Sequence, residues 1–556
     1  MLIPYVTALL VDHGILERDM QHIYLYGLAM IGLALLSLLF GIAGGRMAAR
    51  ASAGFACNLR SAMYRNIQTF AFSNIDKFST SGLITRMTTD ITMLQNAFQI
   101  VLRITVRAPF SLILSIFMCM FINVRTSLIF LAALVILGMF LTYIIGKVAP
   151  LFTQMFKKYD NLNASIQENI SAIRLVKAYV REEHEEGKFS QAADELYDIS
   201  VKGESLMALL HPMMQLMTYG CIIAIAWFGS HFVVDGSLTT GELVSIFSYI
   251  MMILTSLMML SMIFVMLTMS GASARRVSQV IQEEAHIVSP ENALTTVPDG
   301  SICFQNVNFA YTNGSGEYAI SDINLDISSG ERVGLIGATA SGKSTLVLLV
   351  SRLYDVSRGQ VLVGGHPVTA YQLQTLRNAV SVVLQQNLLF SGTILDNLRW
   401  GNPDATPEEC REACRLACAD EFIQQMPQQY DTKIEQGGTN VSGGQRQRLC
   451  IARALLKKPK ILILDDATSA CDTATDARIR ANLRRALPGM TQLIISQRVN
   501  TIMECDRILV MEAGKVNGIG THEELMAHNA IYQEFYTIQQ ECGGDFDSPK
   551  QKGGQA

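Results

Sequence analysis

The residues best suited to chemistry lie in the C-terminal half, where residues 337–344 read GATASGKS. This segment fits the pattern G-x-x-x-x-G-K-[ST] and lies between the strand-like run ERVGLIG and the helical run TLVLLVSRLY, the context of a phosphate-binding loop. Backbone N–H groups in such a loop bind anionic oxygens, Lys343 would reach the β- and γ-phosphates, and the Ser344 hydroxyl would bind Mg²⁺. The segment predicts a nucleoside triphosphate site formed by Gly337, Ala338, Thr339, Ala340, Ser341, Gly342, Lys343, Ser344 and Thr345.

Two further segments carry residues of the same kind of chemistry. Residues 461–472, ILILDDATSACD, place Asp465 and Asp466 directly after an aliphatic run, which is typical of a buried parallel strand that ends at a site. Residues 441–445, VSGGQ, open the helical run RQRLCIARALL, which ends before Pro459. A small, glycine-rich turn at a helix N-terminus predicts a second place where an anion binds.

The order and spacing of these motifs resemble the ATP-binding cassette (ABC) family across the whole chain. In this resemblance Tyr311 matches the aromatic residue that stacks on adenine, and Gln385 matches the glutamine that joins Mg²⁺ to the membrane domain. Residues 469–472 match the loop that contacts the opposite subunit. The resemblance implies ATP and Mg²⁺ as cofactors, with Ser344, Gln385 and Asp465 as metal ligands. It also implies that a signature closes the ATP site of a second chain, here through Ser442, Gly443, Gly444 and Gln445.

Three positions depart from the family's pattern. Asp466 stands where the family has its catalytic glutamate, and its carboxylate lies one methylene, about 1.5 Å, nearer the backbone. Gln497 replaces the histidine that contacts the γ-phosphate, and an amide can neither become cationic nor relay a proton. Ala340 replaces a glycine, which costs about 1 kcal/mol if the position needs φ > 0. Since a shift of about 1 Å can cost about 10²-fold in rate, we expect ATP to bind and to be hydrolysed slowly.

The elements that must position these residues alternate between strand-like and helical runs from about Gly300, which is typical of a mostly parallel α/β sheet. The strand-like runs are SICFQNVNFAY, ERVGLIG, VSVVL, KILILDD, QLIIS and RILVME. Residues 299–541 are the predicted nucleotide-binding domain, an α/β P-loop domain with a helical subdomain. Residues 542–556 are polar and glycine-rich and are predicted to be a disordered tail. Residues 410, 414 and 418 are cysteines, a spacing that favours a packed helix face over a metal site.

The N-terminal half is predicted to be a transmembrane domain, residues 1–275, joined to the cassette by a linker at 276–298. A membrane-spanning helix needs about 20 apolar residues, and a soluble core helix is the alternative interpretation of such a segment. Arg and Lys concentrate in the segments 46–107 and 147–202, which places these segments in the cytoplasm. The stretches without Asp, Glu, Lys or Arg are 22–45, 108–124, 126–146, 205–234 and 243–274.

The first helix is expected to be truncated. Residues 1–11, MLIPYVTALLV, are apolar but too few to cross a bilayer. A cleaved signal peptide would have a basic n-region and a small-residue cleavage site, so an internal start codon within a six-helix domain is the better account.

A transmembrane domain followed by one cassette resembles the half-transporters of exporter type, which pair and dock short cytoplasmic helices on the nucleotide domains. We expect these helices near 74–78 and within 181–190. The resemblance implies an ATP hydrolase coupled to export of hydrophobic or amphipathic compounds, of the multidrug or lipid type, across the cytoplasmic membrane. The formal net charge of −4 argues against a nucleic-acid partner.

The departures at Asp466 and Gln497 favour a heterodimer whose second half-transporter carries Glu and His at these positions. The alternatives are a homodimeric exporter with active sites of its own, a peptide exporter, and an ATP-gated regulatory or channel-like protein. The last span is rich in methionine, which suits promiscuous apolar cargo, and lipid-facing filler is the alternative. These methionines are Met251, Met252, Met258, Met259, Met262, Met266 and Met269. Arg103 and Arg107 are expected to snorkel at the interface.

Overall fold

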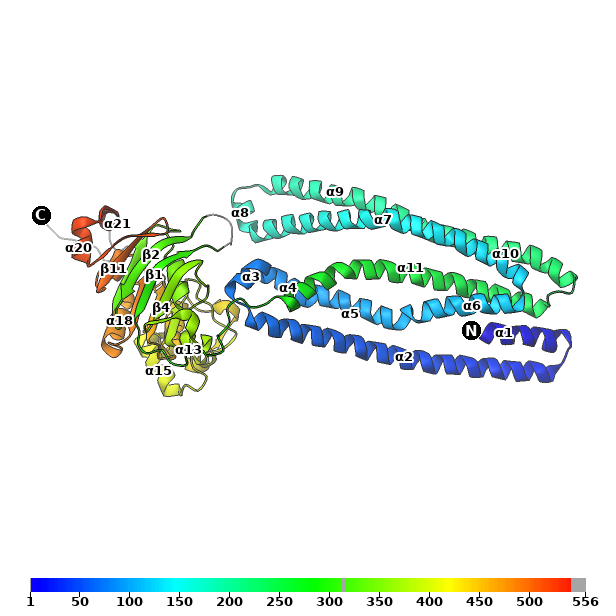
Figure 1. Ribbon diagram of the computed structural model, residues 1–556, viewed down its shortest axis with the longest axis horizontal. Helices are drawn as coiled ribbons and strands as arrows, with labels where there is room; N and C mark the ends of the chain where they lie inside the picture. Colours follow the sequence, from blue (N-terminus) through cyan, green and yellow to red (C-terminus); the bar gives the residue numbers. More distant parts are fainter. Residues whose placement is uncertain (1, 312–316, 542–556) are drawn as a thin grey trace. The chain divides into compact units, whose positions relative to one another are not determined.

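The computed structural model describes residues 2–311 and 317–541, so the predicted tail at 542–556 lies outside the described residues. The chain divides into two compact units, both drawn in Figure 1. The first unit consists of Met1–Ile67 and Ser81–Gln282, and the second of Gln68–Thr80 and Glu283–Ala556.

The first unit is helical wherever the structure describes a regular element. Five of its described segments are long and apolar enough to cross a membrane: Met20–Thr69, Thr80–Ile122, Val124–Ser171, Glu182–Val234 and Thr240–Phe264. They overlap the five charge-free stretches, so the prediction of five spanning segments is confirmed. A shorter apolar helical segment, Leu2–Leu16, precedes them.

Helix α11 is central to the packing of the first unit. It contacts α6, α5 and α1, whereas α7 packs along α9 and α10 (Figure 1). The helices are α1 (Leu2–Leu9), the π-helix η1 (Leu10–Leu16), α2 (Met20–Thr69), α4 (Thr80–Thr85), the π-helix η2 (Arg86–Asp90), α5 (Ile91–Ile100), the π-helix η3 (Val101–Thr105), α6 (Arg107–Ile122), α7 (Val124–Ser171), α8 (Ile173–Ala178), α9 (Glu182–Ala208), α10 (Leu210–Val234) and α11 (Thr240–Gln282).

Two carboxylates form hydrogen bonds near the two ends of α11. At its start, Asp12 Oδ1 accepts a hydrogen bond from the Gly241 N–H at 2.8 Å, and Oδ2 accepts one from the Thr239 hydroxyl at 2.6 Å. Near its end, the buried Asp90 accepts a charge-assisted hydrogen bond from Arg276 Nε at 2.8 Å. These contacts connect the start of α11 to η1 and its C-terminal part to η2.

The two short cytoplasmic helices expected from the resemblance differ in how well the sequence located them. Helix α3 (Phe72–Phe78) confirms the first. The second was placed wrongly at 181–190, because the short helix is α8 and residues 182–190 begin the long α9. The chain turns at Val180, whose φ is 51°, and three glutamates in the first turn of α9 stabilise its N-terminus.

The main sheet of the second unit has six strands in the order β12-β11-β3-β10-β9-β6. All neighbouring pairs are parallel except β11 and β12, so the predicted mostly parallel sheet is confirmed. The strands are β3 (Arg332–Gly337), β6 (Val380–Val383), β9 (Ile461–Asp465), β10 (Thr491–Ile495), β11 (Arg507–Glu512) and β12 (Lys515–Gly520).

A second, antiparallel sheet was not predicted from the sequence. Its four strands have the order β2-β1-β4-β5. The run SICFQNVNFAY forms β1 here, so assigning it to the parallel sheet was wrong; a strand's own residues do not specify which strand it pairs with. The strands are β1 (Ile302–Phe309), β2 (Ile320–Ile327), β4 (Arg358–Val363) and β5 (His366–Pro367), and a separate pair consists of β7 (Gly392–Thr393) and β8 (Lys433–Ile434).

Helices α14 to α16 form the predicted helical subdomain between β6 and α17. Cys410 and Cys414 are buried on α15, whereas Cys418 lies beyond its end with φ of 54°, so the stripe is only partly helical. The described residues contain no cluster of His, Cys, Asp and Glu able to hold a metal. The helices are α12 (Lys343–Val350), α13 (Leu373–Ala379), α14 (Ile394–Arg399), α15 (Pro407–Leu416), α16 (Asp420–Gln424), α17 (Gly443–Leu455), α18 (Thr473–Ala486), α19 (Val499–Ile502), α20 (His522–His528) and α21 (Ala530–Glu541), with 3₁₀ turns at Val368–Ala370, Gln429–Asp431 and Gln436–Gly438.

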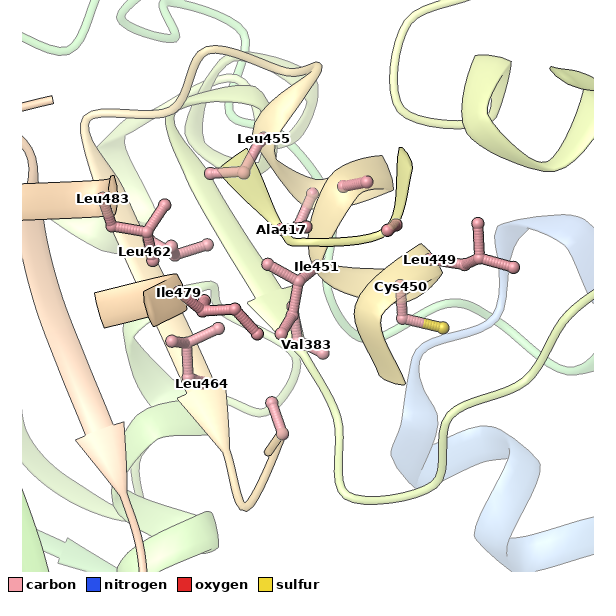
Figure 2. Close-up of a cluster of buried hydrophobic side chains, with 14 of the residues drawn as sticks. Val383, Ala417, Leu449, Cys450, Ile451, Leu455, Leu462, Leu464, Ile479 and Leu483 are labelled. Atoms are coloured by element: carbon pink, nitrogen blue, oxygen red, sulfur yellow. The ribbon is translucent and has the colours of Figure 1, made fainter. Parts of the chain in front are cut away.

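Figure 2 shows the apolar cluster that fixes α17 in this unit. Ile451 and Leu455 of α17 belong to the same buried cluster as Leu462 and Leu464 of β9. Ile479 of α18 completes this part of the core. The helix that follows VSGGQ and the strand that ends in Asp465 therefore share one hydrophobic core.

Candidate nucleotide site

Four segments of the predicted site follow adjacent parallel strands. Strands β3, β10, β9 and β6 are neighbours in this order, so their carboxyl ends meet at one edge of the sheet, where α/β proteins bind ligands. β3 leads into the phosphate loop and β9 ends at Asp465. Gln497 lies two residues after the end of β10, and Gln385 lies two residues after the end of β6.

The phosphate loop wraps around its lysine. Lys343 is 8% exposed, and its Nζ donates hydrogen bonds to the carbonyl oxygens of Gly337 at 2.9 Å and Ala338 at 2.7 Å. A third bond reaches Ser341 Oγ at 3.1 Å. Gly337 has φ of 155°, and a Cβ there would lie 2.1 Å from the Met511 carbonyl oxygen, so only glycine fits at the start of the loop.

Ala340 adopts a left-handed conformation with φ of 62°. The sequence predicts an energetic cost only if position 340 has φ > 0, and the structure shows that it does, so an alanine occupies a position that favours glycine. The conformation costs about 1 kcal/mol, which strains the loop without removing a contact to a phosphate.

The two adjacent aspartates have different backbone conformations. Asp465 ends β9 and is buried, while Asp466 turns to φ of 50° and its N–H donates to the Ile495 carbonyl oxygen at 3.0 Å. Asp466 thus lies in a turn next to β10, so its carboxylate does not continue the alternation of the strand.

Burial governs the electrostatics of this edge. It raises the pKa of Asp465, against the lowering effects of a Ser344 hydrogen bond and the charge of Lys343. Burial also raises the pKa of Asp466, which the charge of Arg498 lowers. The pKa of Lys343 is lowered by burial and raised by both aspartates. The two carboxylates therefore lack full compensation in the chain, which favours a cation beside them.

The donor set fits Mg²⁺. Ser344, Gln385 and Asp465 offer a hydroxyl, an amide and a carboxylate oxygen, the hard ligands that Mg²⁺ prefers. No group of three or more His, Cys, Asp or Glu occurs among the described residues, so a metal here would take its other ligands from phosphates and water.

Tyr311 presents a half-exposed ring near the loop. Its hydroxyl shares a hydrogen bond with Thr345 Oγ1 at 2.9 Å, and its ring contacts Tyr354 edge-on at 5.3 Å between centroids. Tyr354 in turn packs against Phe72 of α3 at 5.9 Å and donates to Asp76 Oδ2 at 2.8 Å. The sequence reasoning missed Tyr354, because its role depends on contacts with a segment nearly 280 positions earlier.

Gln385 and Gln497 both have exposed side chains. Gln385 lies in the loop after β6, where its backbone carbonyl oxygen accepts a hydrogen bond from Asn387 Nδ2 at 3.3 Å. The backbone carbonyl oxygen of Gln497 accepts a shorter hydrogen bond, 2.6 Å, from Gln539 Nε2. Both residues are therefore accessible to solvent.

The signature residues form a closed unit at the start of α17. Ser442 Oγ accepts from the Gln445 N–H at 3.2 Å, and Gln445 Oε1 accepts from the Ser442 N–H at 2.9 Å, a reciprocal capping box. Among the described residues, no hydrogen bond joins residues 442–445 to residues 337–345. The hydrogen bonds described for each segment therefore stay within that segment or its neighbours, which is compatible with a signature that serves a second chain.

Gln447 links the signature helix to the loop at 469–472, a role that the sequence reasoning missed. Its buried side chain donates from Nε2 to Ser469 Oγ at 3.0 Å, and its Oε1 accepts from the Ala470 N–H at 2.9 Å. A weaker contact of 3.4 Å reaches the Asp466 carbonyl oxygen. The run QRQRL contains this residue, but only the packing of α17 shows which glutamine faces inward.

Two family models match the chain. The ABC transporter transmembrane region matches residues 1–284, and the ABC transporter domain matches residues 320–469. In the solved structures, a bacterial Atm1-family ABC exporter with ATP bound is similar, with a TM-score of 0.82, 24% identity, and coverage of 98% of this chain and 96% of that chain. At this identity the likeness shows the fold.

Curated relatives cover nearly the same length. The chain is 36% identical over 536 residues to the uncharacterized ABC transporter ATP-binding protein YfiB of Bacillus subtilis, covering 96% of this chain and 93% of the relative. An ATP-dependent lipid A-core flippase of Syntrophus aciditrophicus is 33% identical over 484 residues, with coverage of 87% and 80%. The putative multidrug export ATP-binding/permease protein YgaD of Bacillus subtilis is 32% identical over 484 residues, with coverage of 87% and 83%.

Proposed function

Because the chain belongs to the ABC transporter family and has the fold of an exporter, we propose that it is the slow-hydrolysing half of a heterodimeric exporter. It is a multi-pass membrane protein with a cytoplasmic ATP-binding domain, and its ATPase activity drives export. The observation that carries the proposal is the contrast between two altered catalytic positions, Asp466 and Gln497, and an intact signature in the same domain.

The proposed site residues act in two groups. Lys343 and the loop N–H groups hold the phosphates, and Tyr311 stacks on adenine. Ser344, Asp465 and Gln385 would hold Mg²⁺, which neutralises phosphate charge when bound. For the domains we propose a membrane part at 1–275, a linker at 276–298 and a nucleotide-binding part at 299–541.

Slow hydrolysis follows from the reach and chemistry of two side chains. A general base contributes about 10²–10⁴-fold, and Asp466 carries a carboxylate about 1.5 Å short of a glutamate's on a backbone already turned to φ of 50°. Gln497 donates a hydrogen bond but no positive charge. The partner would supply Glu and His at these positions, and Ser442 to Gln445 of this chain would close the partner's site.

Helix α3 offers a route from nucleotide to membrane helices. Asn74 Nδ2 donates to the Glu284 carbonyl oxygen at 3.0 Å, and Tyr354 donates to Asp76. Tyr354 also contacts Tyr311, so binding of adenine against Tyr311 would affect α3 through the rings of Tyr311 and Tyr354. This arrangement supports coupling of ATP binding to helix movement.

The cargo is proposed to be hydrophobic or amphipathic, as the names of the flippase and multidrug relatives suggest for those proteins. A cavity of about 200 Å³ between α6 and α11 is lined by Met251, Met252 and Met259, and by Arg107. Flexible thioethers around a cavity favour a role in cargo binding over lipid-facing filler. Arg107 at this cavity favours contact with a polar group of the cargo over simple snorkelling.

The test is ATPase activity in the membrane complex isolated through a tag on this chain. Asp466→Glu combined with Gln497→His should raise turnover about tenfold or more, and Asp466→Asn should change it little. A homodimer with its own active sites predicts the opposite: brisk hydrolysis by this chain alone, lost on Asp466→Asn. A channel-like protein would conduct ions without cargo-stimulated ATPase activity.

A further inference from the structure

Helix α21 is hydrogen-bonded to the loop that carries Gln497 through the side chain of Gln539. Gln539 Nε2 donates to the Gln497 carbonyl oxygen at 2.6 Å, and Gln539 Oε1 accepts from the Val499 N–H at 2.8 Å. The carboxamide of Gln539 therefore bonds the backbone on both sides of Arg498, once as a donor and once as an acceptor.

The rest of this loop is fixed by the sheet and by the loop at 469–472. The Ser496 N–H donates to the Leu335 carbonyl oxygen at 3.3 Å, next to the phosphate loop. Arg498 donates from its guanidinium to the carbonyl oxygens of Cys471 at 3.2 Å and Ser469 at 3.0 Å. With these contacts in place, the Gln539 bonds fix the backbone from which the exposed Gln497 side chain extends.

A glutamine is suited to this position because the two bonds need opposite groups. The Val499 N–H lies in the first turn of α19, where backbone donors lack a partner within the helix, so an acceptor is required. The Gln497 carbonyl oxygen requires a donor. A carboxamide supplies both, a carboxylate supplies only the acceptor, and leucine supplies neither.

Helix α21 is anchored firmly enough to impose this geometry. Tyr532 is fully buried, its hydroxyl shares a 2.8 Å hydrogen bond with His522 Nδ1, and its N–H donates to Asn529 Oδ1 at 2.9 Å. Phe535 and Tyr536 pack against the core that also contains Ile502 of α19. Gln539 therefore lies at the end of a helix held by the same core as the loop it contacts.

We propose that Gln539 is a positioning residue that aims the Gln497 amide at the γ-phosphate, so that the site distinguishes ATP from ADP. The inference rests on the γ-phosphate contact proposed for Gln497. Gln539 itself touches no nucleotide, and its effect passes through the Gln497 backbone.

The test compares the affinities of the full-length chain for Mg–ATP and Mg–ADP. Gln539→Leu should weaken ATP binding about fivefold and leave ADP binding unchanged, because the γ-phosphate is the only group that differs. Gln539→Glu, which keeps the acceptor for Val499, should show the same selective loss. Gln540→Leu is the matched control, since within the described part of the chain Gln540 Nε2 bonds the Tyr536 hydroxyl, at 3.0 Å, and not the loop that carries Gln497.

The double variant separates the possible failures. If Gln497→Ala lowers the ATP preference and Gln539→Leu adds nothing to it, the inference holds. An equal loss of ATP and ADP binding in Gln539→Leu would make the residue merely structural and overturn the inference. An unchanged preference in Gln497→Ala would remove the proposed γ-phosphate contact itself, and the inference with it.

Discussion

The phosphate-loop region and the signature region of this chain differ in how their polar groups are arranged. At the signature, Ser442 and Gln445 satisfy each other's backbone and Gln447 ties the helix to the next loop. At the phosphate loop, Ala340 is strained and the carboxyl group of Asp466 carries a raised pKa. One region is complete within the chain, whereas the other depends on charges that the chain does not supply.

The two kinds of site should differ in how sensitive they are to a side-chain substitution. Anion binding by a loop or a helix N-terminus relies on backbone N–H groups, which a substitution such as glycine to alanine leaves in place. Base catalysis relies on the reach of one carboxylate, so the loss of one methylene matters. Under the proposed function, this domain would keep its anion-binding surfaces while its rate of ATP hydrolysis falls.

The largest effect is expected from a break in the signature. A Cβ at Gly444 would lie 2.8 Å from the Ala470 carbonyl oxygen, so Gly444→Val should displace the signature and lower the ATPase activity of the isolated complex about 10²-fold or more. Gly489→Ala is the control, because no atom lies within 4 Å of its added Cβ. If Gly444→Val were harmless while Lys343→Ala abolished turnover, the ranking of the two regions would be reversed.

The next largest effect is expected from removing the hydrogen bonds by which Gln447 joins the signature helix α17 to the loop at 469–472. Gln447→Leu leaves the Ala470 N–H without its acceptor and removes the bond that Ser469 Oγ accepts, which should lower the free energy of unfolding by about 1–3 kcal/mol. The melting temperature of the second unit measures it. The exposed Gln425, replaced by Leu, should leave the melting temperature unchanged. Equal melting temperatures for the two variants would show that the Gln447 bonds do not stabilise this region.

Relief of backbone strain should strengthen the weaker region slightly. Ala340→Gly removes a left-handed alanine and should raise the free energy of unfolding by about 1 kcal/mol, or the melting temperature by about 2–4 °C. Ala338→Gly, in the same loop but without positive φ, should lower stability instead. Two variants that changed stability in the same direction would contradict the strain at residue 340.

The smallest effect concerns the charge on Asp465. Its folded-state pKa is raised above 3.8 by burial, so the folded protein binds this proton more tightly than the unfolded chain does. Its charge therefore destabilises the nucleotide-free protein above the raised pKa, and stability is regained as pH falls through that pKa. Asp465→Asn should melt higher than the parent near neutral pH, with a gap that narrows on acidification.

The control is Asp404→Asn, which removes an exposed carboxylate in the same unit and should not change the melting temperature. A gap for Asp465→Asn that stayed constant with pH would refute a contribution from the buried charge.

The sequence predicted the local parts of this protein well. The phosphate loop, the strand ending in Asp465 and the helix after VSGGQ are each encoded by contiguous residues, and all occur where expected. The long spans were predicted because a bilayer imposes a length and an apolar composition that any stretch shows by itself. The short helix α8 was misplaced because the turn at Val180 lacks a glycine or proline signal.

Tertiary structure alone decided which distant groups meet. The antiparallel sheet, the contact of Tyr354 with α3, the inward face of Gln447 and the reach of Gln539 all join residues separated by many positions. The sequence by itself determined residue types, periodicity and motif spacing, because these act within a few turns of chain. Pairing across the fold depends on the burial of whole surfaces, and no short segment carries that information.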